Sequence, residues 1–359
     1  MTQTNKSYAT ATVNKLPGSE IEVVGSIAPE AWGSFRAQAL KNLNDSVKLD
    51  GFRKGNIPEN VLISKIGEMA VLEEMAELAV PKAYIDIVIE QKLDVIGKPA
   101  IHVTKLAANN PIEFKAKVAV VPEVTLPDYK AIAAKVNKES DPADIAVTPK
   151  DIEDAILRVR KMHASHEGHD HDKMTPEEHD KAIMDNLPEL TDDMVKKIGD
   201  FEDVPDFKNK LSGILAEDKK NAAREKGRAR IADALADKAK VEIPEILIES
   251  ELNRSQSQFE ADIERMGLKL EDYLKHAKKE IADIRKEWRP NAEKKAKLQL
   301  ILNEIAKAEK IAPTPEEIEA EVSHIVAHYQ DADRERAAVY AETVLTNDKV
   351  FEFLEGQKA

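Results

Sequence analysis

Residues 51–58 read Gly-Phe-Arg-Lys-Gly-Asn-Ile-Pro, and the rest of the chain is organised around this stretch. Two glycines bracket an aromatic residue and two cations, and the final proline is suited to the start of a helix. Because glycine adopts left-handed backbone conformations at little cost, Phe52, Arg53 and Lys54 can be displayed at the tip of a loop. An exposed ring can bury itself in a groove on a partner, and two cations suit phosphate or carboxylate groups.

A simpler interpretation treats the same residues as an ordinary loop between two helices. Phe52 would then fold back into its own core, while Arg53 and Lys54 would be merely solvated. Spacing alone favours this simpler interpretation, because most single surface motifs carry no function.

Both flanks of this stretch have the apolar periodicity of helices. Pro29 opens the first helical pattern, and Pro81 is expected to mark a joint near the end of the second. The apolar positions are Ala31, Phe35, Leu40, Leu43 and Val47 before the loop, and Val61, Leu62, Ile66, Met69, Leu72, Met75 and Leu78 after it. The stretch is therefore expected to join a pair of helices.

Strand patterns lie on either side of this helical pair. Residues 11–24 read as a hairpin, and residues 95–103 read as a strand that is interrupted at Gly97-Lys98-Pro99. Residues 112–120 alternate apolar and polar side chains, as a half-buried strand does. This order predicts an α+β fold for residues 1–122, with helices on one face of an antiparallel sheet.

The motif and this order of elements together resemble the N-terminal domain of the bacterial trigger factor family. All the fixed positions of that family's ribosome-docking signature are present, namely Gly51, Phe52, Arg53, Lys54, Gly55 and Pro58. The resemblance implies that Phe52, Arg53 and Lys54 contact protein and rRNA on the large ribosomal subunit near the exit tunnel. It also implies that Gly51, Gly55 and Pro58 shape the loop.

The composition limits the classes of function. With a net charge of −14, the 359-residue chain is not expected to coat nucleic acid, so any contact with RNA must be made by a small basic tip. There is no cysteine, and therefore no disulfide or thiolate metal site is expected. We find no signal-peptide pattern, no membrane span and no Walker-type nucleotide loop. These features predict a cytoplasmic protein that needs no cofactor and has no membrane partner.

The middle of the chain departs from the resemblance. Residues 123–150 are proline-rich and are expected to form an extended linker, and a helix capped by Thr148 should follow. Residues 151–186 contain this helix and a histidine-rich segment where the family has a prolyl-isomerase domain of FKBP type. So short a segment cannot bury a core of its own, which predicts that the isomerase domain is absent and that the protein is not an enzyme.

The histidine-rich segment has two interpretations. Its imidazoles and carboxylates could hold zinc or nickel loosely, or the segment could be a flexible linker in which histidine is incidental. We favour the linker and therefore assign no metal site. The weak candidate ligands are His163, His166, His169 and His171.

Residues 187–359 are expected to be entirely helical. Long runs start near Pro205, Pro244 and Thr314, and another is expected to kink or break at Pro290. Periodicity cannot separate a closed bundle from an elongated domain with arm-like helices around a cradle. The resemblance implies the cradle, and the sequence does not identify which apolar residues contact clients.

The resemblance therefore implies a ribosome-associated, ATP-independent chaperone that holds nascent or unfolded polypeptides. It also leaves room for a homodimer away from the ribosome. Two alternatives remain at this point: a holdase that never meets a ribosome, and a metal-handling protein that uses the histidine-rich segment.

Overall fold

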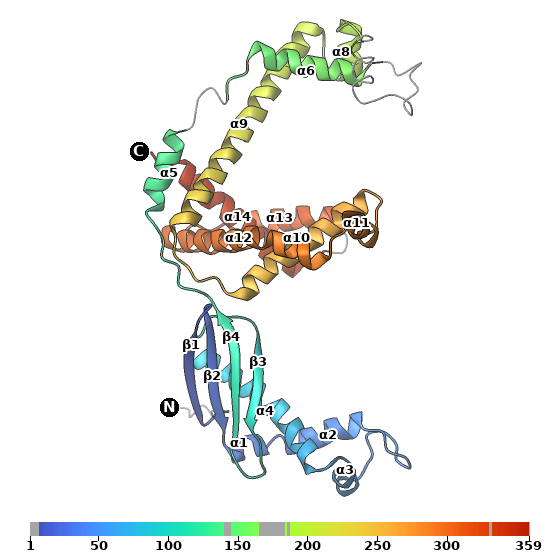
Figure 1. Ribbon diagram of the computed structural model, residues 1–359, viewed down its shortest axis with the longest axis vertical. Helices are drawn as coiled ribbons and strands as arrows, with labels where there is room; N and C mark the ends of the chain where they lie inside the picture. Colours follow the sequence, from blue (N-terminus) through green and yellow to red (C-terminus); the bar gives the residue numbers. More distant parts are fainter. Residues whose placement is uncertain (1–6, 140–144, 165–183, 185–186, 330–331, 359) are drawn as a thin grey trace. The chain divides into compact units, whose positions relative to one another are not determined.

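The computed structural model describes residues 7–139, 145–164, 184, 187–329 and 332–358. The chain forms two compact units, and each combines segments that are distant in the sequence (Figure 1). Unit 1 consists of Met1–Leu126 and Ala239–Glu304, and unit 2 consists of Pro127–Lys238 and Ile305–Ala359.

Unit 1 contains an antiparallel sheet of four strands in the order β1-β2-β4-β3. The strands are β1 (Thr10–Leu16), β2 (Glu20–Ile27), β3 (Val95–Lys105) and β4 (Ile112–Val120). The expected hairpin is confirmed, and Gly18 takes a φ of +78° in its turn. The expected interruption of the third strand is a shift of register between Ile96 and Ala100.

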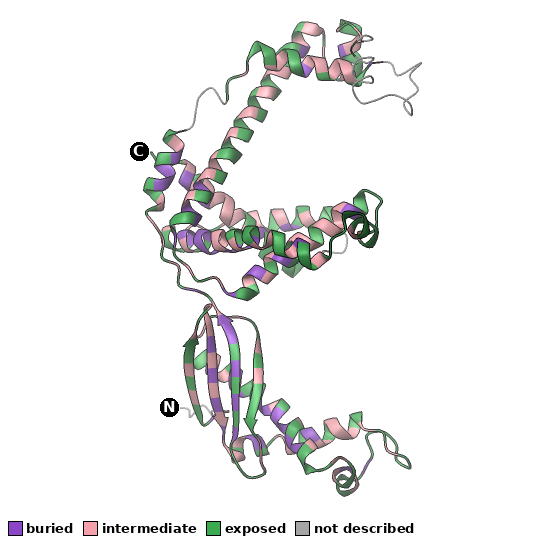
Figure 2. Ribbon diagram, in the orientation of Figure 1, coloured by how far each residue is buried: buried purple, intermediate pink, exposed green. Residues whose placement is uncertain are grey.

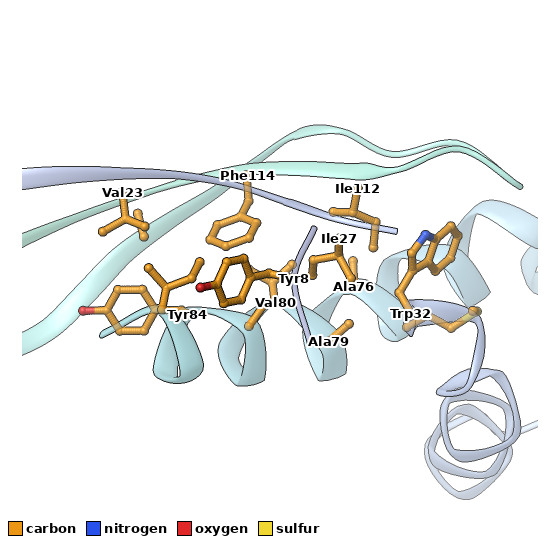
Figure 3. Packing of buried hydrophobic residues seen from close by; sticks show 14 of the residues in the cluster. Tyr8, Val23, Ile27, Trp32, Ala76, Ala79, Val80, Tyr84, Ile112 and Phe114 are labelled. Carbon is orange, nitrogen blue, oxygen red and sulfur yellow. The ribbon is translucent and has the colours of Figure 1, made fainter. Parts of the chain in front are cut away.

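Four helices lie between the second and third strands. They are α1 (Pro29–Gly33), α2 (Arg36–Ser46), α3 (Glu59–Ile66) and α4 (Glu68–Glu90). Helix α4 packs on one face of the sheet, and Figure 3 shows Val23 and Phe114 of the sheet facing Val80 and Tyr84 of α4. Alternate residues of β4 are buried against this helix (Figure 2), so the predicted α+β fold is confirmed.

Pro81 does not end or break its helix, contrary to the sequence-based expectation. Helix α4 continues through Pro81 to Glu90, and the break lies earlier, at Gly67 with a φ of +85°. Proline removes one backbone donor, but both Pro81 and Glu77, whose carbonyl loses its partner, are exposed. Water can satisfy that carbonyl, while the buried face of α4 holds the helix in place.

Three further helices contribute to unit 1. They are α10 (Glu245–Arg265), α11 (Leu270–Ala277) and α12 (Ile281–Glu309), the last of which extends beyond the unit boundary. Ile248, Leu252 and Ala292 form a small core between α10 and α12. Next to it the ring of Phe259 packs edge to face on both Tyr273 and Trp288.

The expected break at Pro290 is also wrong. Helix α12 passes through Pro290, and the break lies between α11 and α12, where Lys278 adopts a left-handed conformation. Both Pro290 and Lys286, whose carbonyl loses its donor, are exposed. Solvent can therefore reach this part of the helix, as it can at Pro81.

The described part of unit 2 is helical. Its helices are α5 (Tyr129–Lys138), α6 (Pro149–Met162), α8 (Asp192–Ile198), α9 (Val204–Lys238), α13 (Pro315–His328) and α14 (Arg334–Glu355). The capping boxes expected at Thr148 and Thr314 are present. With 35 residues, α9 is about 50 Å long, and residues 208–230 of it include no buried side chain. This stretch of α9 has the character of an arm.

The predicted linker at residues 123–150 is not extended throughout. Residues 129–138 form α5, which packs on α9 and α14 and buries Ile132 and Val136. The Asn137 side-chain amide also donates to three carbonyls at the end of α14, at 3.0–3.1 Å. The prolines on both sides of α5 favoured a linker, but they do not predict that the segment between them packs on α9 and α14.

The predicted helical region at residues 187–359 is divided between the two units. Residues 239–304 group with the N-terminal sheet domain, and residues 305–359 group with α5, α6 and α9. Two contacts between residues distant in the sequence join the first group to the N-terminal domain. Thr125 and Lys240 pair as a β-bridge, and the Gly18 amide donates to the Glu242 carboxylate.

Candidate docking loop

Residues 47–58 connect α2 to α3 and form the loop predicted from the sequence. Val47 follows the last turn of α2, and Pro58 is the N-cap of α3, one position earlier than the first helical place. Figure 1 shows this loop projecting at the end of the helical pair. The motif therefore lies at the place in the fold that the sequence indicated.

Asn44 holds the base of the loop, and sequence analysis missed it. Its side chain donates to the Ile57 carbonyl at 2.7 Å and accepts from the Ile57 amide at 3.0 Å, in the manner of a paired strand residue. Its own carbonyl accepts from the Gly55 amide at 3.1 Å. Asparagine in the last turn of a helix often bonds nearby backbone groups, and this tendency was the available signal.

Ile57 anchors the same end of the loop in the core. Only 3% of its surface is exposed, and Leu62 of α3 is buried as well. Burial of a side chain of this size contributes about 1.5–3 kcal/mol relative to full exposure. The C-terminal end of the loop is thus held by the buried Ile57 side chain and by the two hydrogen bonds of the Asn44 side chain.

Both glycines of the motif adopt the backbone conformation predicted for them. Gly51 has a φ of +87° and Gly55 a φ of +82°. A Cβ atom on Gly55 would lie 2.9 Å from the Asp45 carboxylate, whereas open space surrounds the same position on Gly51. Glycine is therefore favoured at both positions by the backbone conformation, since the exposed Asp45 side chain could move away from a Cβ atom on residue 55.

The three residues between the glycines face solvent. Phe52 keeps 40% of its surface exposed, and Arg53 and Lys54 are also exposed. No hydrogen bond or ion pair joins the Arg53 or Lys54 side chain to any residue that the structure describes. The inward-folded Phe52 of the simpler interpretation does not occur, and both cations are available to an anionic partner.

An ion-pair cluster fixes the helices that carry the loop. Arg36, at the start of α2, donates to Glu68 at the start of α4, and its guanidinium lies 3.6 Å from Glu59 at the start of α3. The hydrogen bond from Arg36 lowers the pKa of Glu68 below its ordinary value. These pairs are partly exposed, so each contributes at most about 1 kcal/mol, but together they join three helix starts.

This arrangement is suited to docking and offers no catalytic chemistry. An aromatic ring and two cations stand on a loop whose base is held by Asn44 and Ile57. The ring can enter an apolar groove, while the guanidinium can bind phosphate oxygens in a fork and the ammonium can act as a point charge. Because hydrogen bonds already hold the backbone at Gly55 and Ile57, this end of the loop has less backbone entropy to lose on binding.

The histidine-rich segment lies mostly outside the described residues. His163 is the exposed residue after α6, and His166, His169 and His171 fall in residues 165–183, which are not described. Within the described ranges, no group of three or more potential metal ligands occurs. Among the helices that the structure describes, none is both long and apolar enough to cross a bilayer.

Comparison with known proteins identifies the family. Residues 9–159 match the family model described as "Bacterial trigger factor protein (TF)", and residues 203–359 match the model of its C-terminus. The chain is 26% identical to the trigger factor of Moorella thermoacetica, with 88% of the chain and 87% of the relative covered. It is equally identical to that of Halothermothrix orenii, with 87% and 88% covered.

A solved structure has the same fold at low sequence identity. Its title is "Promiscuous Substrate Recognition in Folding and Assembly Activities of the Trigger Factor Chaperone". The TM-score is 0.53 at 17% identity, and the match covers 97% of this chain and 99% of the other. Since the two family models together match most of the 359 residues, the chain belongs to the bacterial trigger factor family.

Proposed function

We propose that this ribosome-associated chaperone docks on the large ribosomal subunit through Phe52, Arg53 and Lys54. The main support for this proposal is that these three side chains are exposed on a loop held by Asn44, without partners among the described residues. Both ribosomal protein and rRNA are expected at the contact, since the ring needs a groove and the cations need anions. The body of the chain, at a net charge of −14, is repelled by RNA and leaves the contact to this loop.

The client is proposed to be a nascent or unfolded polypeptide, held without ATP. Exposed large apolar side chains support this part of the proposal, because they are available to an unfolded chain. Unit 2 carries some of them on α14 and at the residue after α13, and unit 1 carries others around α11. They are Tyr329, Val339, Tyr340 and Val344 in unit 2, and Met266, Leu268 and Tyr273 in unit 1.

The proposal includes no isomerase activity and places the protein in the cytosol. Residues 160–202 lie between the two ranges matched by the family models. A segment of about 40 residues without disulfides rarely forms a domain with its own core. Release of clients is then expected to depend on weak contacts that exchange quickly.

Cosedimentation with ribosomes tests the docking proposal. Replacement of Phe52, Arg53 and Lys54 together by alanine is expected to reduce binding at least about tenfold, which corresponds to 1.4 kcal/mol. A matched control replaces Ile89, Lys98 and Lys286 by alanine, which removes one exposed apolar and two exposed cationic side chains elsewhere in unit 1. Equal loss in both variants, or no loss in the first, would overturn the proposal.

A further inference from the structure

An apolar groove runs between α4 and the edge strand β3, away from the docking loop's contact residues. Its volume is about 660 Å3, and its lining includes Met69 of α4 and Ile101, Val103 and Leu106 of the strand and its end. Met69 is 54% exposed and Val103 is 43% exposed. Helix α4 covers the centre of the sheet but leaves this margin uncovered, so apolar surface remains accessible to a partner.

The strand that borders the groove has a free edge. In the order β1-β2-β4-β3, β4 is the one strand among the described residues that pairs with β3. In the part of the chain that the structure describes, no other element donates to or accepts from the backbone of residues 100–105 on the outer side. An unpaired edge of this kind accepts an additional strand, whose alternate side chains then point to one face.

Register places that face over the groove. Ile101 lies opposite Ala116, and Val103 lies opposite Phe114, and both partners on β4 are fully buried on the side of α4. Ile101 and Val103 therefore point toward α4, and the alternate side chains of an added strand would continue the same row. Because Ile101 and Val103 are apolar, side chains of an added strand that lie beside them should be apolar as well.

The groove also has a charge preference. Glu73 and Glu77, one helical turn apart on α4, line it together with the apolar residues. Both are exposed, and within the described ranges neither has an ion-pair or hydrogen-bond partner. Lysine or arginine in a bound segment would be stabilised here, and acidic residues would be repelled.

We propose that this groove binds an extended segment of an unfolded polypeptide by strand addition to β3, with alternate apolar side chains and flanking lysine or arginine. The inference rests on the proposed chaperone function, to which it adds a client site on the N-terminal sheet domain. It does not depend on docking to the ribosome. The segment would pair its backbone with residues 100–105, bury alternate side chains against Val103 and Met69, and place its cations beside Glu73 and Glu77.

Hydrogen exchange on the full chain without ribosomes tests this mode of binding. The probe is a soluble peptide in which valine alternates with threonine and a lysine stands at each end. Amides of residues 100–105 are expected to exchange more slowly with the peptide present, because strand addition gives them partners. A peptide with glutamate at each end is expected to bind about tenfold more weakly at low salt.

Three variants make the test specific. Val103→Lys is expected to weaken binding of the lysine-ended peptide about tenfold, whereas Ile89→Lys, at a 69% exposed position of α4 outside the groove, should not. Replacement of Glu73 and Glu77 together by lysine should reverse the preference between the two peptides. Because all four positions are exposed, circular dichroism of each variant should match the wild type.

Three outcomes would overturn the inference. Peptide-induced protection found only outside residues 100–105 would place the client elsewhere. Equal effects of Val103→Lys and Ile89→Lys would show that the groove is not the site. Protection of residues 100–105 that appears without peptide and grows with protein concentration would assign the edge to a second copy of the chain. The experiment contains no ribosomes, so its failure leaves the docking proposal unaffected.

Discussion

Asn44 holds the base of the loop that carries the proposed docking residues Phe52, Arg53 and Lys54. Its side chain pairs with both backbone groups of Ile57, and its carbonyl accepts from Gly55. The exposed ring and cations therefore stand on a backbone that is held before the partner arrives. Pre-organisation of this kind raises affinity by removing an entropy cost, not by adding a contact.

Asn44→Ala is expected to weaken ribosome binding while the docking side chains remain in place. Loss of the amide pair leaves two backbone groups of Ile57 without partners, which costs about 1–3 kcal/mol of local stability. Hydrogen exchange of residues 51–57 should become faster, and ribosome affinity should fall several-fold. Asn42→Ala is the matched control, because Asn42 bonds Glu74 on α4 and does not contact the loop. Wild-type exchange and affinity in Asn44→Ala would contradict this role.

The sequence predicted the tip of the loop well and its support poorly. Glycine, phenylalanine, arginine and lysine carry their conformational and chemical meaning in their type, so Gly51–Lys54 could be interpreted directly. Asn44 and Ile57 matter through a contact between the end of one helix and the start of the next. Such a contact depends on tertiary geometry, which residue types alone do not specify.

Helices and strands were predictable where a cap or a strict alternation was present, as at Thr148, Thr314 and residues 112–120. The prolines were misleading, because α4 and α12 pass through Pro81 and Pro290. In both helices the residue whose carbonyl loses a donor is exposed, so water can replace the missing hydrogen bond. Helix α5 was also missed, because its stability comes from packing on α9 and α14, not from its own periodicity.

An ion-pair cluster between α9 and α14 gives unit 2 a pH-dependent stability. Burial alone would raise the pKa of Glu355, but hydrogen bonds from Arg224 and Arg228 outweigh it and hold the pKa below 4.5. Arg228 also bonds Asp348, at 2.6 Å, and its side chain is only 14% exposed. The Glu355 carboxylate therefore contributes stability above about pH 4.5, and this contribution is lost as the pH falls through its lowered pKa.

Glu355→Gln is expected to destabilise unit 2 by about 1–3 kcal/mol at pH 7. The difference in free energy of unfolding between the variant and the wild type should shrink as the pH falls below 4.5, because the wild-type carboxylate then takes up a proton. Urea unfolding at a series of pH values measures this difference. As a control, Glu153→Gln changes an exposed acid of α6 and should have little effect. A pH-independent difference would show that the charge of Glu355 is not the cause.

At the scale of the whole molecule, the order of segments in the sequence does not match the order of packing. Residues 239–304 join the sheet domain, and residues 305–359 join the segment that starts at Pro127. Periodicity reports which face of a helix is buried but not what buries it, so this division could not be predicted from the sequence. The fold class and the net negative charge were predictable, since they follow from the pattern and the composition of the sequence. The basic tip at Arg53 and Lys54 was predictable for the same reason.

The proposal that the chain has no isomerase activity leads to a further expectation. The full chain should not accelerate a refolding step limited by prolyl isomerisation, which takes tens of seconds without a catalyst. The measurement is the refolding rate of a substrate protein limited by prolyl isomerisation, with the chain added in substoichiometric and in stoichiometric amounts. An FKBP-type isomerase added to the same reaction provides the positive control. Clear acceleration by substoichiometric amounts of the chain would contradict the expectation.

The most direct test of the account is the salt dependence of ribosome affinity for the wild type and the Arg53→Ala, Lys54→Ala variant. If both cations neutralise phosphates, the wild type should bind more tightly at low salt. Its plot of log K against log salt concentration should be steeper by about 1.4–1.8, the difference expected for two phosphate contacts. Equal affinities of the two proteins at every salt concentration would contradict the claim that this acidic chain reaches the ribosome through its docking loop.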